Sequence, residues 1–420
     1  MATPAVQVLF DDPGGRVDGH RAEMRASLKA AWDLWAQHLD ADRTIEISLT
    51  AGSGESGRGL HAIASAGQAF WYPTDRPATA DGGIPSRGSV EEELISGTGP
   101  TPGSRDATIT LYSSMSDMVF PSDNATEVPV DQTDMLNVFT HEIGHILGIA
   151  DGRFDVGYPR LYETLTEVRE QSPFGTQKQF NGPEVRDHVG GPIPLYLRVF
   201  GGGSDPAHFD SLDDIMNATS SNENAHVSRA DLAVLADLGL PVKESSLTGP
   251  IGGSPGVDTV RGTRKDDRLI ASNGDDIFIG ESGTDTVVFP EPRDAYGQVG
   301  RTRVTGPTGD DQLDGIERLE FADTTVDLTA GGGGGGASGG GIDLLGLSLQ
   351  QQVSAVYVGY YARAPDPAGL SFWRGELESQ ANAGADPGVA LAGVAESFRQ
   401  DDEGTATYPF LAPDAAADAS

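Results

Sequence analysis

The sequence predicts an α+β domain with a mixed twisted sheet, followed by a short parallel β-roll and a small α-helical domain. Three observations support this fold class. Strand-like and helix-like stretches alternate up to an amphipathic helix at residues 134–148. A nine-residue period rich in glycine and aspartate follows, and two helical stretches come last. The predicted boundaries are 1–245 for the first domain, 246–330 for the roll, 331–341 for a Gly-rich linker, 342–411 for the helical domain and 412–420 for a disordered tail.

The composition is strongly acidic and lacks cysteine. The 63 Asp and Glu residues outnumber the 28 Lys and Arg residues, so the formal net charge is −35. This excess argues against nucleic acid or an anionic membrane as a partner, because both are negatively charged. Without cysteine there is no disulfide and no thiolate metal site, so any metal must be held by His, Asp or Glu. No stretch is apolar for long enough to span a membrane, and the N-terminus lacks the pattern of a secretory signal.

The first domain is predicted to begin with a strand at Val6–Phe10 and a helix at Gly19–Leu39. The helix is amphipathic, because apolar residues recur along one face at Met24, Leu28, Trp32, Trp35 and Leu39. Further strands are predicted at Thr44–Thr50, His61–Tyr72 and Asp106–Ser113.

Residues 134–148 contain two histidines and a glutamate in the arrangement H-E-x-x-H. His141 and His145 are four residues apart, so on a helix both rings point to one side and can reach one metal ion at roughly 2.0–2.1 Å. Glu142 follows the first histidine and does not ligate the metal. The arrangement is typical of zinc peptidases, in which the glutamate is the general base. Apolar residues on another face predict that the helix is anchored in a core: Leu136, Phe139, Ile143 and Ile146.

Catalytic zinc normally has three protein ligands and one open position. Two residues compete for the third place. Asp151 extends the motif to H-E-x-x-H-x-x-G-x-x-D, and its carboxylate would bind at roughly 2.0–2.2 Å. His208 lies farther along the chain and is followed by Met216.

The chain after the helix resembles the leishmanolysin-like and serralysin-like metzincins, which are zinc metallopeptidases. The resemblance is carried by the stretches Phe180–Pro183, Gly190–Leu195, Asp214–Ala218 and Ser228–Val242. It implies a zinc-dependent endopeptidase that hydrolyses a protein or peptide substrate, with Glu142 as general base. The implied zinc ligands are His141, His145 and His208, with Asp151 as the alternative third ligand. Met216 would lie in a turn beneath the metal and take no part in the chemistry.

The resemblance also concerns the strand Asp106–Ser113. In metzincins the strand before the active-site helix lies at the sheet edge, where its free N–H and C=O groups pair with an extended substrate. An ordinary core strand is the other interpretation of this stretch. The alternative function is a non-catalytic surface or adhesion protein that keeps the peptidase scaffold.

The second domain is predicted from its nine-residue period. Asp267, Asp276 and Asp285 recur at this spacing over three turns, and so do the apolar residues Leu269, Phe278 and Val287. The pattern resembles the nonapeptide of RTX proteins, which forms a calcium-binding parallel β-roll. It implies Ca²⁺ held by these aspartates and by turn carbonyls at roughly 2.3–2.6 Å. RTX proteins are typically exported by a type I secretion apparatus without an N-terminal signal, so the resemblance implies an extracellular protein.

The last predicted domain, residues 342–411, contains two helical stretches around a Pro-rich turn. It resembles a small helical domain of unknown function that is often found with RTX repeats. The resemblance assigns it no activity.

Overall fold

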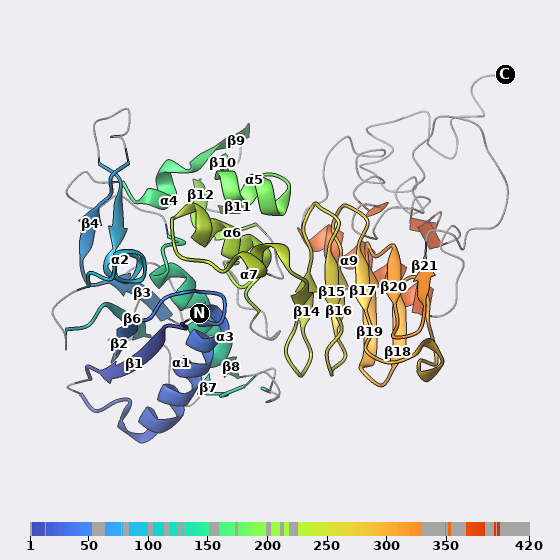
Figure 1. The fold of residues 1–420 in the computed structure, drawn as a ribbon, viewed down its shortest axis with the longest axis horizontal. Coiled ribbons are helices and arrows are strands. Elements are labelled where there is room, and N and C mark those ends of the chain that lie inside the picture. The colour runs from blue at the N-terminus through green and yellow to red at the C-terminus, as the bar shows by residue number, and fades with distance from the viewer. Residues whose placement is uncertain are drawn as a thin grey trace, which may run out of the picture.

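The computed structural model describes residues 2–328 with gaps, of which the longest are 53–63, 151–158 and 218–225 (Figure 1). Beyond these it describes residues 349, 352–353, 367–382, 390–391 and 393–394. Three separate hydrophobic clusters lie along the chain: Val8 to Leu247, Ile251 to Leu328 and Val353 to Val394. The part up to Gly249 is called the N-terminal region below, and residues 251–328 are called the roll. No helix among the described residues is long and apolar enough to cross a membrane.

The N-terminal region is built on a four-stranded sheet in the order β1-β2-β6-β3. The strands β1 (Ala5–Phe10), β2 (Thr44–Ala51) and β6 (Ala107–Leu111) are parallel, and β3 (Ala64–Gln68) runs antiparallel. The helix α1 (Arg21–Ala36) contacts β1, α3 (Met135–Ile146) contacts β3, and the two helices contact each other. They therefore cover one face of the sheet together. Trp35 joins them, because its buried Nε1 donates to the Thr140 carbonyl at 2.9 Å.

Of the two interpretations of Asp106–Ser113, the core strand is confirmed, and the sheet-edge strand that the resemblance implies is wrong. The strand β6 lies between β2 and β3, and its residues Ala107, Ile109 and Leu111 are fully buried. The edge strand beside α3 is β3, whose small and polar sequence ASAGQ suits a partly solvated position. The predicted strand His61–Tyr72 is also divided, because β4 (Trp71–Pro73) leaves this sheet and pairs with β5 (Ser86–Gly88).

Between the helix α3 and the roll, a second antiparallel sheet has the order β12-β11-β10-β9. Its strands are β9 (Thr166–Ser172), β10 (Gly175–Phe180), β11 (Ile193–Arg198) and β12 (Gly203–Phe209). The helix α5 (Pro183–Val189) lies between β10 and β11 in the chain and packs on α6 (Arg229–Asp237). The remaining short elements are α2 (Ser89–Ser96), β7 (Met118–Val119), β8 (Thr133–Asp134), α4 (Leu161–Thr164) and α7 (Glu244–Thr248).

The repeat segment forms a roll of short, mainly parallel strands in two sheets, ordered β13-β15-β17-β20-β21 and β14-β16-β19-β18 (Figure 1). The first of these strands is β13 (Ile251–Gly252). Successive strands alternate between the sheets, so β14 (Thr259–Arg261) pairs with β16 (Ile277–Ile279) and β15 (Arg268–Ile270) pairs with β17 (Thr286–Val288). Two nine-residue repeats therefore make one coil. The interior of the roll is filled by buried apolar side chains, which include Val260, Leu269, Phe278, Val287, Leu313 and Leu319.

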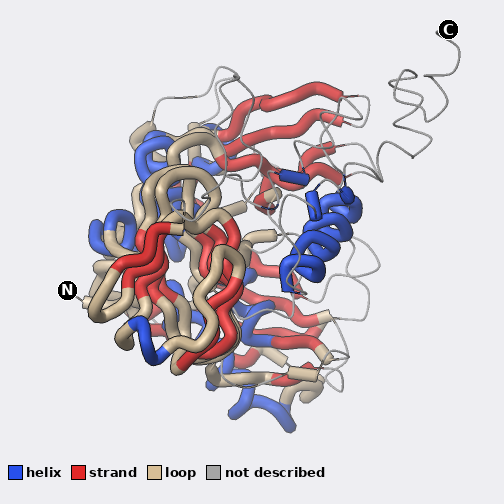
Figure 2. Tube along the Cα trace, turned by 90° about the vertical axis from the view of Figure 1, so that its right-hand side faces the viewer, coloured by secondary structure: helices blue, strands red, loops and turns tan. Residues whose placement is uncertain are grey.

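The regular repeat ends after β17. A hairpin of β18 (Arg303–Gly306) and β19 (Gly309–Asp314) follows, and β20 (Arg318–Glu320) and β21 (Thr325–Asp327) complete the sheets. The helix α9 (Pro367–Asn382) lies beside the roll in both views (Figures 1 and 2). The Leu349 N–H donates to Asp314 Oδ1 at 3.0 Å, which joins this C-terminal part to the roll. The predicted Gly-rich linker and the predicted tail fall outside the described residues.

Candidate metal centres

The helix α3 begins and ends where its sequence dictates. The Asp134 carboxylate caps the N-terminus by accepting the N–H groups of Leu136 at 2.8 Å and Asn137 at 3.3 Å. Gly148 follows the helix with a φ of 108°, a conformation that glycine tolerates. Gly144 lies between the two histidines, and a Cβ at this position would lie 2.2 Å from Met216 Sδ. The absence of a side chain at Gly144 therefore lets the methionine pack directly on the helix.

Three histidines meet beside this helix. His141 and His145 come from α3, and His208 comes from β12, the strand that returns toward the helix. One ring nitrogen from each lies within 4.8 Å of the other two. The ring centroids are 4.7 Å apart for the pair on α3 and 5.1 Å from each of these to His208. Asp151, the alternative third ligand, lies outside the described residues.

The orientation of the two α3 rings is set by backbone carbonyls. His141 Nδ1 lies 2.6 Å from the Ile215 oxygen, and His145 Nδ1 lies 2.6 Å from the Ile149 oxygen. A carbonyl only accepts, so each Nδ1 must carry the proton and each Nε2 keeps its lone pair. This is the tautomer that a metal ligand requires. Burial and the neighbouring His141 and His208 lower the pKa of His145 well below its usual value, which keeps this ring neutral.

Met216 lies in a tight turn that packs against α3. Its side chain is fully buried, its N–H donates to Asp214 Oδ1 at 2.8 Å, and its carbonyl accepts the Phe209 N–H at 2.9 Å. The preceding residue, Ile215, provides the carbonyl that orients His141. The turn therefore joins the strand that carries His208 to the helix that carries the other two histidines.

Glu142 is buried, with 6% of its surface exposed. Its carboxylate accepts the N–H of Ala66 on the edge strand β3, and its Oε2 has no hydrogen-bond partner among the described residues. Burial raises the pKa of Glu142 to about 8. A buried carboxylate oxygen without a partner fits a position where water or a cation completes the site. The three histidines equal in number the protein ligands of a catalytic zinc centre, and Glu142 lies on the same helix without being one of them.

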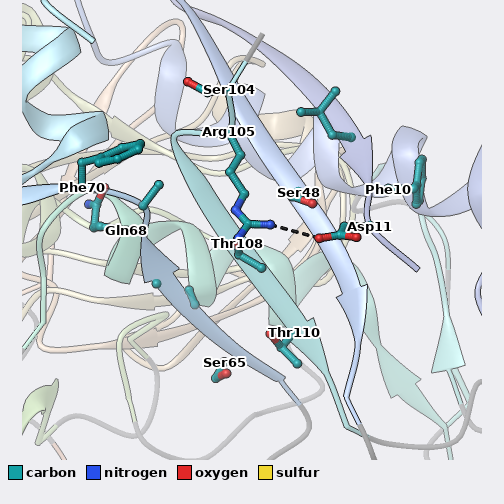
Figure 3. A pocket seen from close by; sticks show the side chains of 14 residues that line it. Phe10, Asp11, Ser48, Ser65, Gln68, Phe70, Ser104, Arg105, Thr108 and Thr110 are labelled. Carbon is teal, nitrogen blue, oxygen red and sulfur yellow. Dashed lines mark hydrogen bonds and ion pairs between the residues drawn. The ribbon is translucent and has the colours of Figure 1, made fainter. Parts of the chain in front are cut away.

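A hollow of about 770 Å³ lies along β3 without any histidine in its lining (Figure 3). Its walls come mainly from the strands β1, β2, β6 and β3 and include Phe10, Ser48 and Thr108. Arg105 reaches across it to Asp11, with 3.0 Å between Nη1 and Oδ2. Its described lining residues include neither a metal-ligand cluster nor a nucleophile–base pair.

The second candidate centre lies in the turns of the roll, where acidic side chains form two ladders. In one ladder the N–H of Asp258 donates to Asp276 Oδ1 at 3.0 Å, and the N–H of Asp276 donates to Asp311 Oδ1 at 3.2 Å. In the other the N–H of Asp267 donates to Asp285 Oδ1, and that of Asp285 donates to Glu317, each at 2.8 Å. All these aspartates are buried.

Comparison with known families identifies these turns. Residues 252–287 match the RTX calcium-binding nonapeptide repeat, in four copies. No curated protein and no solved structure matches the chain. The match corrects the prediction of three turns, because the first repeat contains Asp258, nine residues before Asp267. The nine-residue period could have revealed it.

Two further acidic residues, Asp311 and Glu317, belong to the ladders but do not follow the nine-residue period. The β18–β19 hairpin interrupts the period, so β19 pairs with β16 across a longer sequence separation, Ile277 lying opposite Gln312. Their place beside the aspartates is decided by strand pairing. The nine-residue spacing in the sequence therefore does not predict them.

The residues of the roll fit calcium best at Asp285. Its Oδ2 is buried and has no hydrogen-bond partner among the described residues, and burial raises the pKa of Asp285 to about 8. A Cβ on Gly280 would lie 2.6 Å from this oxygen and 2.0 Å from the Gly315 carbonyl, so the glycine lets both oxygens converge. Converging carboxylate and carbonyl oxygens are what Ca²⁺ prefers. Asp267 differs from Asp285, because its carboxylate contacts Arg229 of the N-terminal region.

Proposed function

We propose that the N-terminal region is a zinc-dependent endopeptidase and that its zinc ligands are His141, His145 and His208. The single observation that carries the proposal is the convergence of three ring nitrogens within 4.8 Å of one another. In His141 and His145 a backbone carbonyl accepts from Nδ1, which selects the tautomer whose Nε2 carries the lone pair that a metal needs. The calcium-binding RTX repeats form a separate centre in the same chain.

Zinc, when bound, would supply Lewis acidity toward water and toward the scissile carbonyl. The protein's own base would be Glu142. Burial raises the pKa of Glu142 to about 8, which makes its deprotonated carboxylate a stronger base than an exposed one. This carboxylate would take a proton from water and return it to the leaving amine. Its contact with the Ala66 N–H places the base directly beside the edge strand.

The substrate would bind along β3. Among the described residues, β3 pairs only with β6, so one edge of the strand is available to another strand. An extended peptide can add to such an edge through main-chain hydrogen bonds. The same strand reaches Glu142 through Ala66, so a peptide paired there would pass close to the base.

The proposal is tested by a conservative change at Glu142. Glu142→Gln should bind zinc as tightly as the wild-type protein and lose casein-hydrolysing activity by about 10²–10⁴-fold, because the general base is removed. The zinc content is measured by elemental analysis, and activity is measured with and without a chelator. Glu23→Gln, on the exposed side of α1, serves as the matched control and should keep full activity. Wild-type activity in the Glu142 variant would show that this residue is not the base. Hydrolysis that persists in the presence of chelator would show that the activity does not need a metal.

We also infer that the chain acts outside the cell, after export by a type I apparatus. The RTX repeats support this, because such repeats are typical of proteins exported in this way. Millimolar external Ca²⁺ would then neutralise the buried aspartates and complete the folding of the roll.

A further inference from the structure

Arg229 is the first residue of α6, and its side chain extends from the N-terminal region into the second RTX repeat. Its Nη1 donates to Asp267 Oδ1 at 2.7 Å, and its Nη2 donates to the Gly249 carbonyl. The ion pair is buried, with 9% of the Arg229 side chain and none of the Asp267 side chain exposed to solvent. A buried arginine paired in this way holds its charge permanently.

The second oxygen of Asp267 is occupied as well. Its Oδ2 accepts the Thr263 N–H at 2.6 Å and the Thr263 hydroxyl at 2.7 Å. A calcium ion bound to Asp267 at roughly 2.3–2.6 Å would therefore lie next to a guanidinium that is fixed at hydrogen-bond distance from the same carboxylate. Two cations at such a distance in a buried site repel each other strongly.

The next coil of the same ladder provides the comparison. Asp285 lies 18 residues after Asp267, and its Oδ1 accepts the Asp267 N–H. Its Oδ2 is buried and has no partner among the described residues. Its charged neighbours are the carboxylates of Asp266, Asp267 and Glu317. Asp267 is thus paired with a cation of the protein, whereas the charged groups named around Asp285 are all carboxylates.

The second repeat also departs in sequence from the RTX pattern. Lys265 stands where the nonapeptide has its third glycine. Its Nζ donates to the Asp187 carbonyl, while the backbone N–H of Arg264 donates to Val189 at 2.9 Å. Arg264 Nη1 also reaches the Pro192 carbonyl at 3.1 Å. The basic residues of this repeat therefore contact the end of α5 and the turn that leads to β11.

We propose that Arg229 takes the place of a calcium ion at the second repeat, so that Asp267 docks the roll on the N-terminal region and does not bind calcium. The docking contact reaches toward the histidine trio. Ser228, next to Arg229, places its Oγ 3.0 Å from Asp214 Oδ2, and Asp214 holds the N–H of Met216. The contacts of Ser228 and Arg229 therefore hold the start of α6 against the turn at Met216, and none of these contacts involves calcium.

The calcium count of the full-length protein tests the assignment. Each variant is stripped with chelator, dialysed against CaCl₂ and analysed for bound calcium. Asp267→Asn should bind the same number of ions as the wild-type protein, whereas Asp285→Asn should bind one fewer. The loss of an ion in the Asp267 variant would overturn the proposal.

Limited proteolysis tests the docking role and does not depend on whether Asp267→Asn folds. In saturating CaCl₂, Arg229→Met should be cleaved between the N-terminal region and the roll at least about tenfold faster than the wild-type protein, because the open junction becomes more populated. Arg268→Met is the matched control, since Arg268 lies in the same repeat and pairs with Glu320 on the surface at 2.7 Å. Equal cleavage rates in the Arg229 and Arg268 variants would overturn the proposal. Neither measurement depends on peptidase activity, so both stand apart from the proposed function.

Discussion

The histidine trio and the roll are built in opposite ways. The trio joins α3 to β12, a strand of the second sheet, and its third histidine is placed by the pairing of β12 and by the turn at Met216. The roll repeats one short pattern, so each coil rests on the coil before it. A centre assembled from distant segments depends on the whole core, whereas a repeated centre depends on its nearest neighbours and its ions. The predictions that follow test this difference.

Calcium removal should have the largest effect, and the effect should be confined to the roll. A calcium-selective chelator leaves buried carboxylates such as Asp276 and Asp285 without a counter-charge. Amide hydrogen exchange in the strands β16 to β20 should then rise steeply, while β2 stays protected. The strands β14 and β15 should keep more protection than β17, because Arg229 neutralises Asp267 beside them. Uniform loss of protection across both regions would show that they unfold as one unit.

His208→Ala should abolish stoichiometric zinc binding while the calcium count stays unchanged. The variant leaves only two imidazoles, one ligand short of the three that a catalytic zinc site normally uses. His188→Ala is the matched control, because His188 lies on α5 and pairs with Glu184 at 3.3 Å, away from the trio. Elemental analysis after dialysis measures both metals. Full zinc occupancy in the His208 variant would mean that another residue completes the site.

Gly144→Ala tests the packing of α3 on the methionine turn. The added methyl would lie 2.2 Å from Met216 Sδ and 3.1 Å from Trp35, so the core must shift. We expect a loss of about 1–3 kcal/mol in the unfolding free energy of the N-terminal region, measured by urea denaturation. Gly375→Ala in α9 is the control, since a Cβ there has nothing within 4 Å, and it should stabilise its helix by about 0.5–1 kcal/mol. If the unfolding free energy of the Gly144→Ala variant equals that of the wild-type protein, the turn at Met216 is loosely packed against α3.

The smallest effect should be an acid sensitivity of the N-terminal region. Burial lowers the pKa of both His38 and His226 to about 4, with Lys243 near the first and His38 near the second. A histidine whose folded pKa is lowered favours folding above its usual pKa of 6.5 and loses this contribution as the pH falls toward 4. The unfolding free energy should therefore decline over this window. His38→Gln can keep a contact with Ser246 Oγ and should reduce the slope of unfolding free energy against pH. An identical slope in this variant would mean that other groups cause the loss of stability in acid.

The local parts of both centres could be predicted from the sequence. The spacing of His141 and His145 needs only one helical turn, and the repeat of Asp267, Asp276 and Asp285 needs only one coil. The helix α3 and the parallel strands of the roll follow from the same short-range patterns. The sequence left open whether Asp106–Ser113 is an edge or a core strand, because the position of β6 in the sheet depends on the strands that flank it.

The sequence by itself determined the H-E-x-x-H helix, the acidic nonapeptides and the absence of thiol ligands, because these depend on residue types at fixed short spacings. Only the tertiary structure decided that His208 joins the other two histidines, that Glu142 meets β3 and that Asp311 and Glu317 extend the ladders. It also decided that Asp267 meets an arginine. The physical reason is that sheet register and domain docking bring together residues whose separation along the chain follows no period.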